Sequence, residues 1–319
     1  MLVAQLGIPQ IDRILGPLPA HASVLIANEP GLEAEAFLYQ TAGDHLAHGR
    51  KVVYLALSRA PGAVLRCVSD LGFRVTDAAA PIFVDAFSGL LGARSGAAYE
   101  VQDPTDEASL LAALERASTE HPDAVLLVDS LSTLVDHWGE ARFARAYAAL
   151  HAALRRFTLS VSLFTRWSYP EAVRQTVEAA DAVIAVRGVE GRVTVSQFFE
   201  VEKVAWRRDH DARPRPFRLE RPGGVLVYLP KIAITGAAGA GKSTFIRSVS
   251  EAAVSVDRLG TTVALDHGRV TLDGLTADLF GTPGEERFEP LLPGLLRHAL
   301  GVLVLVDSTR PESLVRTQA

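Results

Sequence analysis

The stretch KIAITGAAGAGKSTF, residues 231–245, places a glycine-rich loop between a short apolar run and the start of a helix. It has the spacing G-x-x-x-x-G-K-S, in which the glycines let backbone N–H groups turn towards phosphate oxygens. Lys242 would bring a positive charge to the terminal phosphates, and the Ser243 hydroxyl would bind Mg²⁺. The stretch therefore predicts a nucleotide-binding loop in an α/β P-loop fold. The candidate binding residues are Gly236, Gly239, Ala240, Gly241, Lys242, Ser243 and Thr244.

A second loop of similar outline lies at residues 27–37, which read ANEPGLEAEAF and follow the apolar run 24–26. Carboxylates and an alanine stand where a phosphate loop needs glycine, lysine and a hydroxyl, at Glu33, Ala34 and Glu35. Two carboxylates repel a triphosphate, so we expect this loop to have lost nucleotide binding.

Short apolar runs alternate with alanine-rich helical stretches through the first part of the chain. This pattern is typical of buried parallel strands with helices on both faces. The predicted strands are 23–27, 51–57, 124–130 and 160–165. A later strand at 221–228 closes this part, and a new strand begins at Lys231. We therefore predict two α/β domains, residues 1–228 and 229–319.

Composition excludes several classes of protein. The 319-residue chain is 48% hydrophobic with a net charge of −5, so general nucleic-acid binding is not expected. Cys67 is the one cysteine, which excludes an internal disulfide and fits a reducing compartment. No apolar run approaches the ~20 residues of a spanning helix. The N-terminus lacks the basic region and cleavage site of a signal peptide, so we expect a soluble, cytoplasmic protein without a membrane partner.

The first 228 residues resemble the KaiC branch of RecA-like ATPases. The similarity begins at LGIPQIDRILGPLP, residues 6–19, and continues through NEPGLEAEAF, residues 28–37. In the family, the second of these segments is an intact phosphate loop. The resemblance implies a RecA-like parallel-sheet domain whose loop descends from a phosphate loop but no longer has its chemistry.

Other parts of the same family machinery are also changed. The resemblance implies that Arg59 and Ala60 replace a glutamate pair that includes the water-activating acid. Asp129 survives at the end of its strand, where we expect a hydrogen-bonded acid rather than a metal site. Lys203 is kept, whereas Ala205 replaces the arginine that reaches a neighbour's nucleotide. Together these changes predict a pseudo-ATPase scaffold.

The segment after the intact loop resembles a small Ras-like or Arf-like GTPase, closest to the bacterial MglA-like group. The resemblance rests on RLGTTVALDHGRVTL, residues 258–272, and ADLFGTPGEERF, residues 277–288. It implies that Thr262, or alternatively Thr261, binds Mg²⁺ together with Ser243 and senses the γ-phosphate.

The second switch of such a domain reads Asp-x-x-Gly-Gln in the family, and the aligned residues here are Gly281-Thr-Pro-Gly284-Glu285. Gly284 can still offer its N–H to a γ-phosphate, whereas Gly281 replaces the acid that orders Mg²⁺-bound water. Asp278 also satisfies Asp-x-x-Gly but lies out of register. Glu285 replaces the water-positioning glutamine, so we expect slow hydrolysis. Thr262 and Glu285 are the candidate catalytic residues.

The resemblance covers about the first four strands of a GTPase domain, and the Asn-Lys-x-Asp motif that reads guanine is not in the chain. The resemblance implies GTP, and ATP stays open as the alternative because the residues that would select the base are not encoded. The apolar run GVLVLVD, residues 301–307, would leave an open sheet edge. We favour a fragment of a longer chain over a fold completed by association.

Basic residues cluster between positions 203 and 218, but acids and prolines interleave with them, which favours a subunit contact or solvated face over nucleic acid. Trp206 fits packing and base stacking equally well. The leading interpretation is a nucleotide-dependent regulatory switch with GTP, Mg²⁺ and an unidentified protein effector or regulator as partners. A homo-oligomer through the RecA-like faces is also expected. The alternatives are a non-catalytic KaiC-like assembly or signalling adaptor, and an ATPase.

Overall fold

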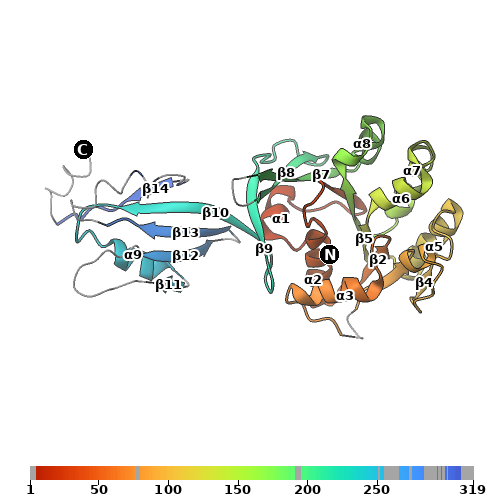
Figure 1. Ribbon diagram of the computed structural model, residues 1–319, viewed down its shortest axis with the longest axis horizontal. Helices are drawn as coiled ribbons and strands as arrows, with labels where there is room; N and C mark the ends of the chain where they lie inside the picture. The colour runs from red at the N-terminus through yellow and green to blue at the C-terminus, as the bar shows by residue number, and fades with distance from the viewer. Residues whose placement is uncertain are drawn as a thin grey trace. The chain divides into compact units, whose positions relative to one another are not determined.

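The computed structural model divides the chain into two compact units, Met1–Val225 and Leu226–Ala319 (Figure 1). It describes residues 5–76, 80–190, 195–250, 252–254, 266–272, 275–283, 293, 296, 299 and 301–309. The predicted switch residues Thr262, Gly284 and Glu285, and the alternative Thr261, lie outside the described residues.

A mostly parallel sheet forms the centre of the first unit, with the strand order β9-β8-β7-β1-β6-β5-β2-β3-β4. Neighbours from β7 to β4 run parallel, whereas β8 and β9 are antiparallel additions at one edge. The strands are β1 (Ala22–Asn28), β2 (Val52–Ala56), β3 (Ile82–Asp85), β4 (Tyr99–Glu100), β5 (Val125–Asp129), β6 (Leu159–Thr165), β7 (Ala182–Glu190), β8 (Val195–Val204) and β9 (Arg215–Glu220). Every residue of β1, β2 and β5 is buried, which confirms the predicted α/β fold with buried parallel strands.

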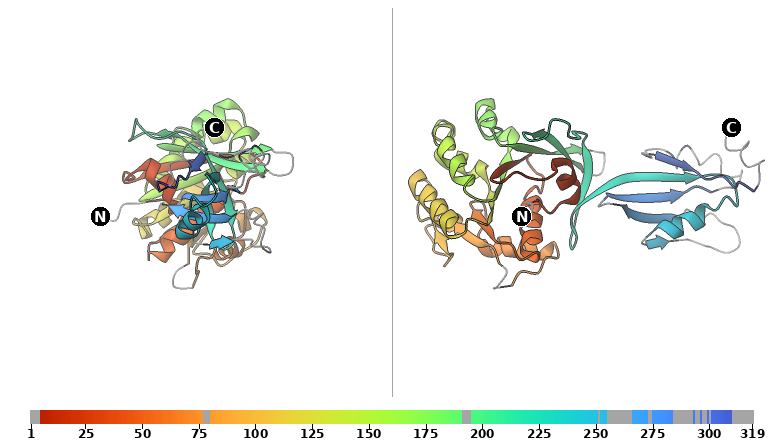
Figure 2. Two further views of the ribbon diagram at one scale, coloured as in Figure 1. Left: turned by 90° about the vertical axis from the view of Figure 1, so that its left-hand side faces the viewer. Right: turned by 180° about the vertical axis from the view of Figure 1, so that it is seen from behind.

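Helices cover both faces of this sheet (Figure 2). Side chains of α5 to α8 pack in one core with alternate strand residues such as Leu25, Leu55 and Leu126. On the other face α2 contacts β2, β5 and β6, and its Phe37 ring meets Phe217 of β9 edge-to-face, with 5.1 Å between centroids. The helices are α1 (Pro9–Leu15), α2 (Glu35–Ala47), α3 (Pro61–Asp70), α4 (Phe87–Leu90), α5 (Glu107–Glu120), α6 (Leu131–Trp138), α7 (Glu140–Leu154), the 3₁₀ turn η1 (Arg166–Ser168) and α8 (Glu171–Val177).

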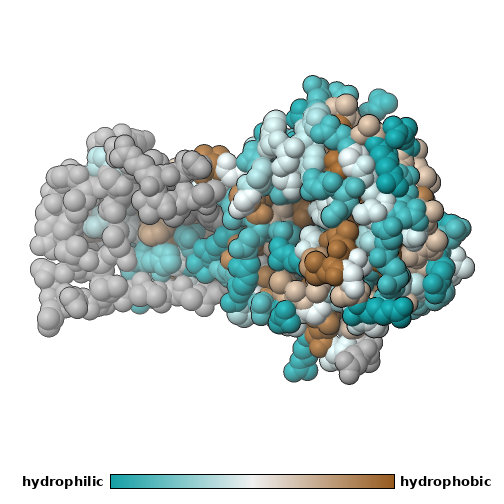
Figure 3. All heavy atoms as spheres, turned by 45° about the vertical axis from the view of Figure 1, so that its right-hand side comes forward, coloured by the Kyte–Doolittle hydropathy of each residue, from teal (hydrophilic) through white to brown (hydrophobic). Residues whose placement is uncertain are grey.

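The surface of the first unit is mostly hydrophilic on the face drawn in Figure 3, where hydrophobic residues form limited patches. Among the described residues of this unit, the large hydrophobic side chains that are exposed are Leu91, Trp167 and Val189. Within the same described ranges, no helix of either unit is both long and apolar enough to cross a membrane.

The second unit is built on a smaller sheet with the strand order β11-β12-β13-β10-β14. Strands β13 and β14 run parallel to β10 on its two sides, and β12 is antiparallel to β13. The elements are β10 (Gly224–Thr235), α9 (Lys242–Val249), β11 (Ala252–Val254), β12 (His267–Leu272), β13 (Leu275–Gly281) and β14 (Gly301–Val304). Ile246 of α9 is buried with Ile234 and Leu279 in the small core of this unit.

Strand β10 corrects one expectation. The sequence predicts a strand that ends near residue 228 and a new one from Lys231, but β10 runs without a break from Gly224 to Thr235. Pro230 suggests an end because it has no N–H to donate. The register between β10 and β13 shifts between Leu229 and Ile232, so the strand absorbs the proline as an irregularity instead of ending.

Strand β14 lies at the edge of the described part of this sheet. Val302, Leu303 and Val304 are 47%, 44% and 48% exposed, so the strand presents apolar side chains to solvent. An exposed apolar edge of this kind favours pairing with another chain segment.

Candidate nucleotide-binding site

Glycines determine the path of the loop that joins β10 to α9. Gly236, Gly239 and Gly241 have φ angles of 142°, 82° and 85°, in the region that favours glycine over other residues. A Cβ at Gly236 would lie 2.2 Å from the carbonyl oxygen of Leu305, closer than real Cβ contacts. A side chain at Gly236 is thus excluded by backbone, and all three glycines give the loop a backbone path that other residues rarely adopt.

Lys242 begins α9 and folds back over this loop, where it is only 9% exposed. Its ammonium donates hydrogen bonds to the carbonyl oxygens of Gly236, at 2.8 Å, and Ala237, at 2.9 Å. Burial lowers the pKa of Lys242, and the negative charge of Asp266 opposes that shift. Charge-assisted bonds to phosphate are stronger than bonds to neutral carbonyls, so an arriving phosphate can take over this ammonium.

Ser243 donates a hydrogen bond from its hydroxyl to a carboxylate oxygen of Asp266, the residue directly before β12. The carbonyl oxygen of Asp266 accepts a hydrogen bond from the Gly281 N–H at 2.7 Å. The hydroxyl of the next residue, Thr282, donates a hydrogen bond to the Thr235 hydroxyl oxygen at 3.0 Å. The end of β10, the end of β13 and the beginning of β12 therefore lie together beside the loop.

Of the predicted site residues, those from Gly236 to Ser243 share this loop and the first turn of α9. Thr244 is exposed. Asp266 belongs to the site's surroundings although sequence reasoning did not select it. The signal in the sequence is its place in the segment 258–272, four residues after Thr262.

The oxygen donors beside the loop suit a hard cation that arrives with phosphates. Mg²⁺ prefers oxygen ligands, and in phosphate sites it takes few of them from the protein. Ser243 and Asp266 supply a hydroxyl and a carboxylate side by side. Within the described ranges, no group of three or more His, Cys, Asp or Glu side chains could hold a metal ion. The loop thus fits Mg²⁺ bound jointly with a nucleotide rather than a protein-only metal site.

Two ion pairs occupy the altered loop of the first unit. The Glu35 carboxylate lies 2.8 Å from the Arg59 guanidinium, and Glu33 pairs with Arg221. Ala34, which stands in the place of the lysine, is fully buried. A cavity of about 290 Å³ opens here and is lined by residues that include Glu33, Glu35, Tyr39, Arg59, Cys67 and Arg221. Glu33 and Glu35 are therefore each paired with an arginine of their own unit.

Asp129 is buried at the end of β5 and both of its oxygens accept hydrogen bonds. Tyr54 donates from its hydroxyl at 2.9 Å, and Ser58 donates at 2.7 Å. Burial raises the pKa of Asp129 despite these two bonds. These contacts agree with the expectation of a hydrogen-bonded acid at the strand end.

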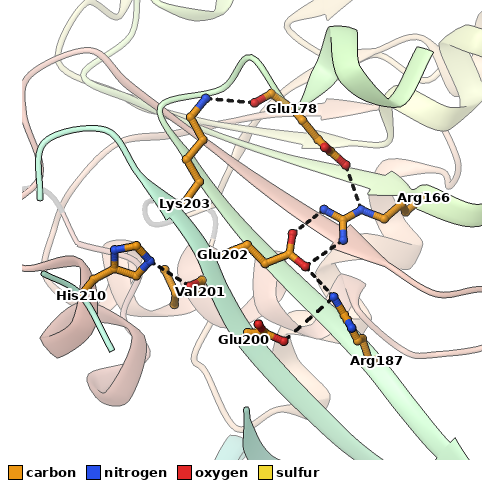
Figure 4. A network of polar contacts seen from close by, with 8 residues as sticks. All are labelled: Arg166, Glu178, Arg187, Glu200, Val201, Glu202, Lys203 and His210. Carbon is orange, nitrogen blue, oxygen red and sulfur yellow. Dashed lines mark hydrogen bonds and ion pairs between the residues drawn. The ribbon is translucent and has the colours of Figure 1, made fainter. Parts of the chain in front are cut away.

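The retained Lys203 belongs to a polar network inside the first unit (Figure 4). Its ammonium donates to the Glu178 carbonyl oxygen at 3.1 Å. In the same network, the Glu202 carboxylate accepts hydrogen bonds from Arg166 and Arg187. Ala205, in the arginine's place, is exposed.

The basic cluster that follows is interleaved with acidic partners. Arg213 and Arg215 both pair with Asp211, and Arg218 pairs with Glu220. The Trp206 indole donates a hydrogen bond to the Leu15 carbonyl oxygen at 2.9 Å, so packing against α1 accounts for this side chain. The ion pairs favour a charge-balanced surface over a cationic groove.

Comparison with known families gives two matches along the chain. The model described as "ATPase: KaiC" matches residues 4–232, and the model described as "50S ribosome-binding GTPase" matches residues 231–317. The solved structure of a KaiC-like protein from the hyperthermophilic archaeon Pyrococcus horikoshii is similar in fold, with a TM-score of 0.56 and 17% identity. That similarity covers 71% of this chain and 98% of the other.

Curated relatives match parts of the chain. A UPF0273 protein of Aeropyrum pernix is 34% identical over 133 residues, which cover 40% of this chain and 54% of that protein. The Ras-related protein Rab-18-B of Danio rerio is 30% identical over 96 residues, which cover 28% of this chain and 44% of that protein. The chain spans about half the length of the curated relatives it matches. It belongs to the KaiC family of ATPases, and a small GTPase-like P-loop domain follows its KaiC-like domain.

Proposed function

We propose that this protein is a nucleotide-dependent regulatory switch in which one P-loop domain binds the nucleotide and the other is a scaffold. The second domain, residues 229–319, binds Mg²⁺·GTP and hydrolyses it slowly. The first domain, residues 1–228, is a pseudo-ATPase. The contrast between the two loops carries this proposal: one holds Lys242 on a glycine path, and the other holds carboxylates paired with arginines.

Nucleotide binding in the second domain relies on the backbone N–H groups of the loop and on Lys242. The ammonium leaves the carbonyls of Gly236 and Ala237 and bonds to the terminal phosphates. Ser243 would hold the Mg²⁺ that accompanies the nucleotide, and the ion would supply positive charge next to the phosphates. The residues proposed to contact nucleotide are Gly236, Gly239, Ala240, Gly241, Lys242, Ser243, Thr244 and Gly284.

Thr262 is proposed to complete the Mg²⁺ site with Ser243 and to sense the γ-phosphate. Glu285 takes the place of the water-positioning glutamine, and its charge near the γ-phosphate slows attack by water. The nucleotide state would then order or release the switch segments for an unidentified protein partner to read. The match to a GTPase family model and the similarity to a GTP-binding protein of Schizosaccharomyces pombe support GTP, with ATP as the alternative.

Loss of nucleotide binding in the first domain follows from charge. In this proposal Glu33 and Glu35 replace residues that contact phosphates in the family, and each already pairs with an arginine, Glu35 with Arg59 and Glu33 with Arg221. Asp129, the remaining acid of the machinery, has both oxygens in hydrogen bonds to protein groups. A domain in this state offers docking surfaces for a partner or a second copy of the chain rather than turnover.

One specific observation favours a second candidate function. Gly281 lacks the carboxylate and Glu285 lacks the amide of the second switch, as expected of a non-catalytic KaiC-like assembly or signalling adaptor. In that case bound nucleotide would not be turned over. Measured GTP hydrolysis that is abolished by Lys242→Ala would reject the adaptor.

The deciding experiment is a titration of fluorescent GTP and ATP analogues with Mg²⁺ into the purified chain. Lys242→Ala should bind about a hundredfold more weakly, because two charge-assisted contacts of roughly 1.5 kcal/mol each are lost. Lys51→Ala is the matched control, because Lys51 is a half-exposed lysine paired with Asp123 in the first unit. Unchanged binding in Lys242→Ala would contradict the assignment of the site.

A further inference from the structure

The end of β13 lacks the acid that a Mg²⁺ site of this kind requires, and an acid on the neighbouring strand lies next to the gap. Gly281 has no side chain to offer. His267 pairs with Phe280 in the antiparallel register of β12 and β13, and one residue further the Gly281 N–H donates to the Asp266 carbonyl oxygen at 2.7 Å. Positions 266 and 281 therefore lie opposite each other across the two strands.

The side chain of Asp266 occupies space that a side chain at position 281 would need. A Cβ at Gly281 would lie 3.1 Å from the Asp266 Cβ and 3.5 Å from its Oδ2 atom. It would also lie 2.9 Å from the Cδ1 atom of Ile246. An acid at 281 and the acid at 266 would compete for one place, and the glycine leaves that place to Asp266.

The Asp266 carboxylate is directed at the phosphate loop. It accepts the hydrogen bond of the Ser243 hydroxyl, and its charge is close enough to raise the pKa of Lys242 against the effect of burial. A serine hydroxyl has one proton and two lone pairs. Ser243 can therefore keep its bond to Asp266 while a lone pair of the same oxygen binds a cation.

We propose that Asp266 is the Mg²⁺-positioning acid of the second domain and replaces the side chain missing at Gly281. Ser243 is the ligand, and Asp266 orients it and accepts a hydrogen bond from the hydration water that Mg²⁺ retains. Asp266 acts through Ser243 and that water, so it is a positioning residue. The inference rests on the proposed binding of nucleotide by this loop.

The test measures the dissociation constant of a fluorescent GTP analogue for the full 319-residue chain, once in excess Mg²⁺ and once in EDTA. Asp266→Asn should lower the gain in affinity due to Mg²⁺ by about tenfold or more, as expected when the outer-shell partner of a metal ligand is lost. The affinity in EDTA should not fall, since this substitution removes only a negative charge near the phosphates. If Asp266 only supported folding, Asp266→Asn would change the dissociation constant by the same factor in Mg²⁺ and in EDTA.

Two further variants make the result specific. Asp278→Asn on β13 removes an acid that pairs with Arg269 at 3.2 Å, and it should keep the wild-type dependence on Mg²⁺. The exchange variant Asp266→Gly with Gly281→Asp moves the carboxylate to the neighbouring strand, and Ile246→Val in the same protein removes the Cδ1 atom that the new side chain would meet. This variant should recover the dependence on Mg²⁺. If Asp266→Asn does not fold, the exchange variant decides the question: an Mg²⁺ effect supports the proposal, and its loss overturns it.

Failure of this inference differs from failure of the proposed function. An Asp266→Asn protein that binds nucleotide with the full wild-type gain from Mg²⁺ would overturn the role of Asp266 alone. A wild-type chain that binds no nucleotide, with Mg²⁺ or with EDTA, would overturn nucleotide binding by the loop and this inference with it.

Discussion

The Arg59 guanidinium lies 2.8 Å from the Glu35 carboxylate, across the mouth of the altered loop in the KaiC-like domain. The resemblance to the KaiC branch implies that Glu35 replaces a Mg²⁺-binding hydroxyl and that Arg59 replaces an acid. In the proposed function, these two substitutions replace a site for a cation and phosphates by an internal ion pair. Once Glu35 is present, Arg59 is the residue type that neutralises it, so the two changes are coupled physically.

This ion pair should be measurable but weak. Glu35 and Arg59 side chains are 25% and 41% exposed, so a double-mutant cycle with Glu35→Gln and Arg59→Gln should give a coupling of about 0.5–1 kcal/mol. Urea unfolding of the four proteins measures the coupling, which should shrink at high salt because partly exposed charges are screened. A cycle between Glu35 and Lys51, which pairs elsewhere with Asp123, is the control and should give no coupling. Additive effects for Glu35 and Arg59 would argue against the pair.

A side chain at Gly236 should disable the second domain. Gly236→Ala places a Cβ 2.2 Å from a backbone oxygen at a φ of 142°, which should cost about 1–3 kcal/mol of stability and weaken nucleotide binding. The control is Gly301→Ala on β14, where a Cβ would meet nothing within 4 Å. Thermal unfolding and analogue titration of both variants measure the difference. Equal behaviour of the two alanine variants would contradict the conformation of the loop.

The contribution of Asp12 to the stability of the KaiC-like domain should fall as the pH rises from about 4 to about 6. Burial raises the pKa of Asp12 from 3.8 to about 6, although the N–H groups of Leu6 and Ile8 donate to its carboxylate. The folded state thus binds the Asp12 proton more tightly than the unfolded state, and stability is lost as the pH passes through this window. The Asp12 contribution is about 3 kcal/mol, because one pKa unit is about 1.4 kcal/mol.

Urea unfolding of wild type and Asp12→Asn between pH 4 and 7 measures this contribution. The free energy of unfolding of Asp12→Asn should vary less with pH across the window, even if its absolute value is lower. Asp123→Asn, which changes a mostly exposed acid, should keep the wild-type slope. A slope that Asp12→Asn leaves unaltered would assign the pH dependence to another group.

Much of the architecture follows from local patterns in the sequence. The runs that become β1, β2, β5 and β6 are apolar along most of their length because both faces of the sheet are covered, and this signal needs no long-range information. The loop before Lys242 is equally local, because its glycines are required by the backbone path itself. These features could be predicted from sequence.

Two contacts that the sequence does not predict join residues that are distant in the chain and are brought together by the sheet. Arg59 and Glu35 each attracted attention as a departure from the family pattern, but their contact depends on the placement of the β2 end beside the start of α2. Asp266 reaches Ser243 because the pairing of β12 with β13 brings its position to the loop. Pro230 suggested a strand end that the register shift in β10 makes unnecessary.

Trp206, whose indole donates a hydrogen bond to Leu15, lies in the same unit as the other tryptophans, and this distribution has a spectroscopic consequence. All three tryptophans of the chain, Trp138, Trp167 and Trp206, lie before residue 226, so ultraviolet emission excited at the red edge comes from the KaiC-like unit alone. The loop at Lys242 contributes no tryptophan emission, because the second unit contains no tryptophan. A change of tryptophan emission when a non-absorbing nucleotide binds there would report directly that the first unit senses events in the second.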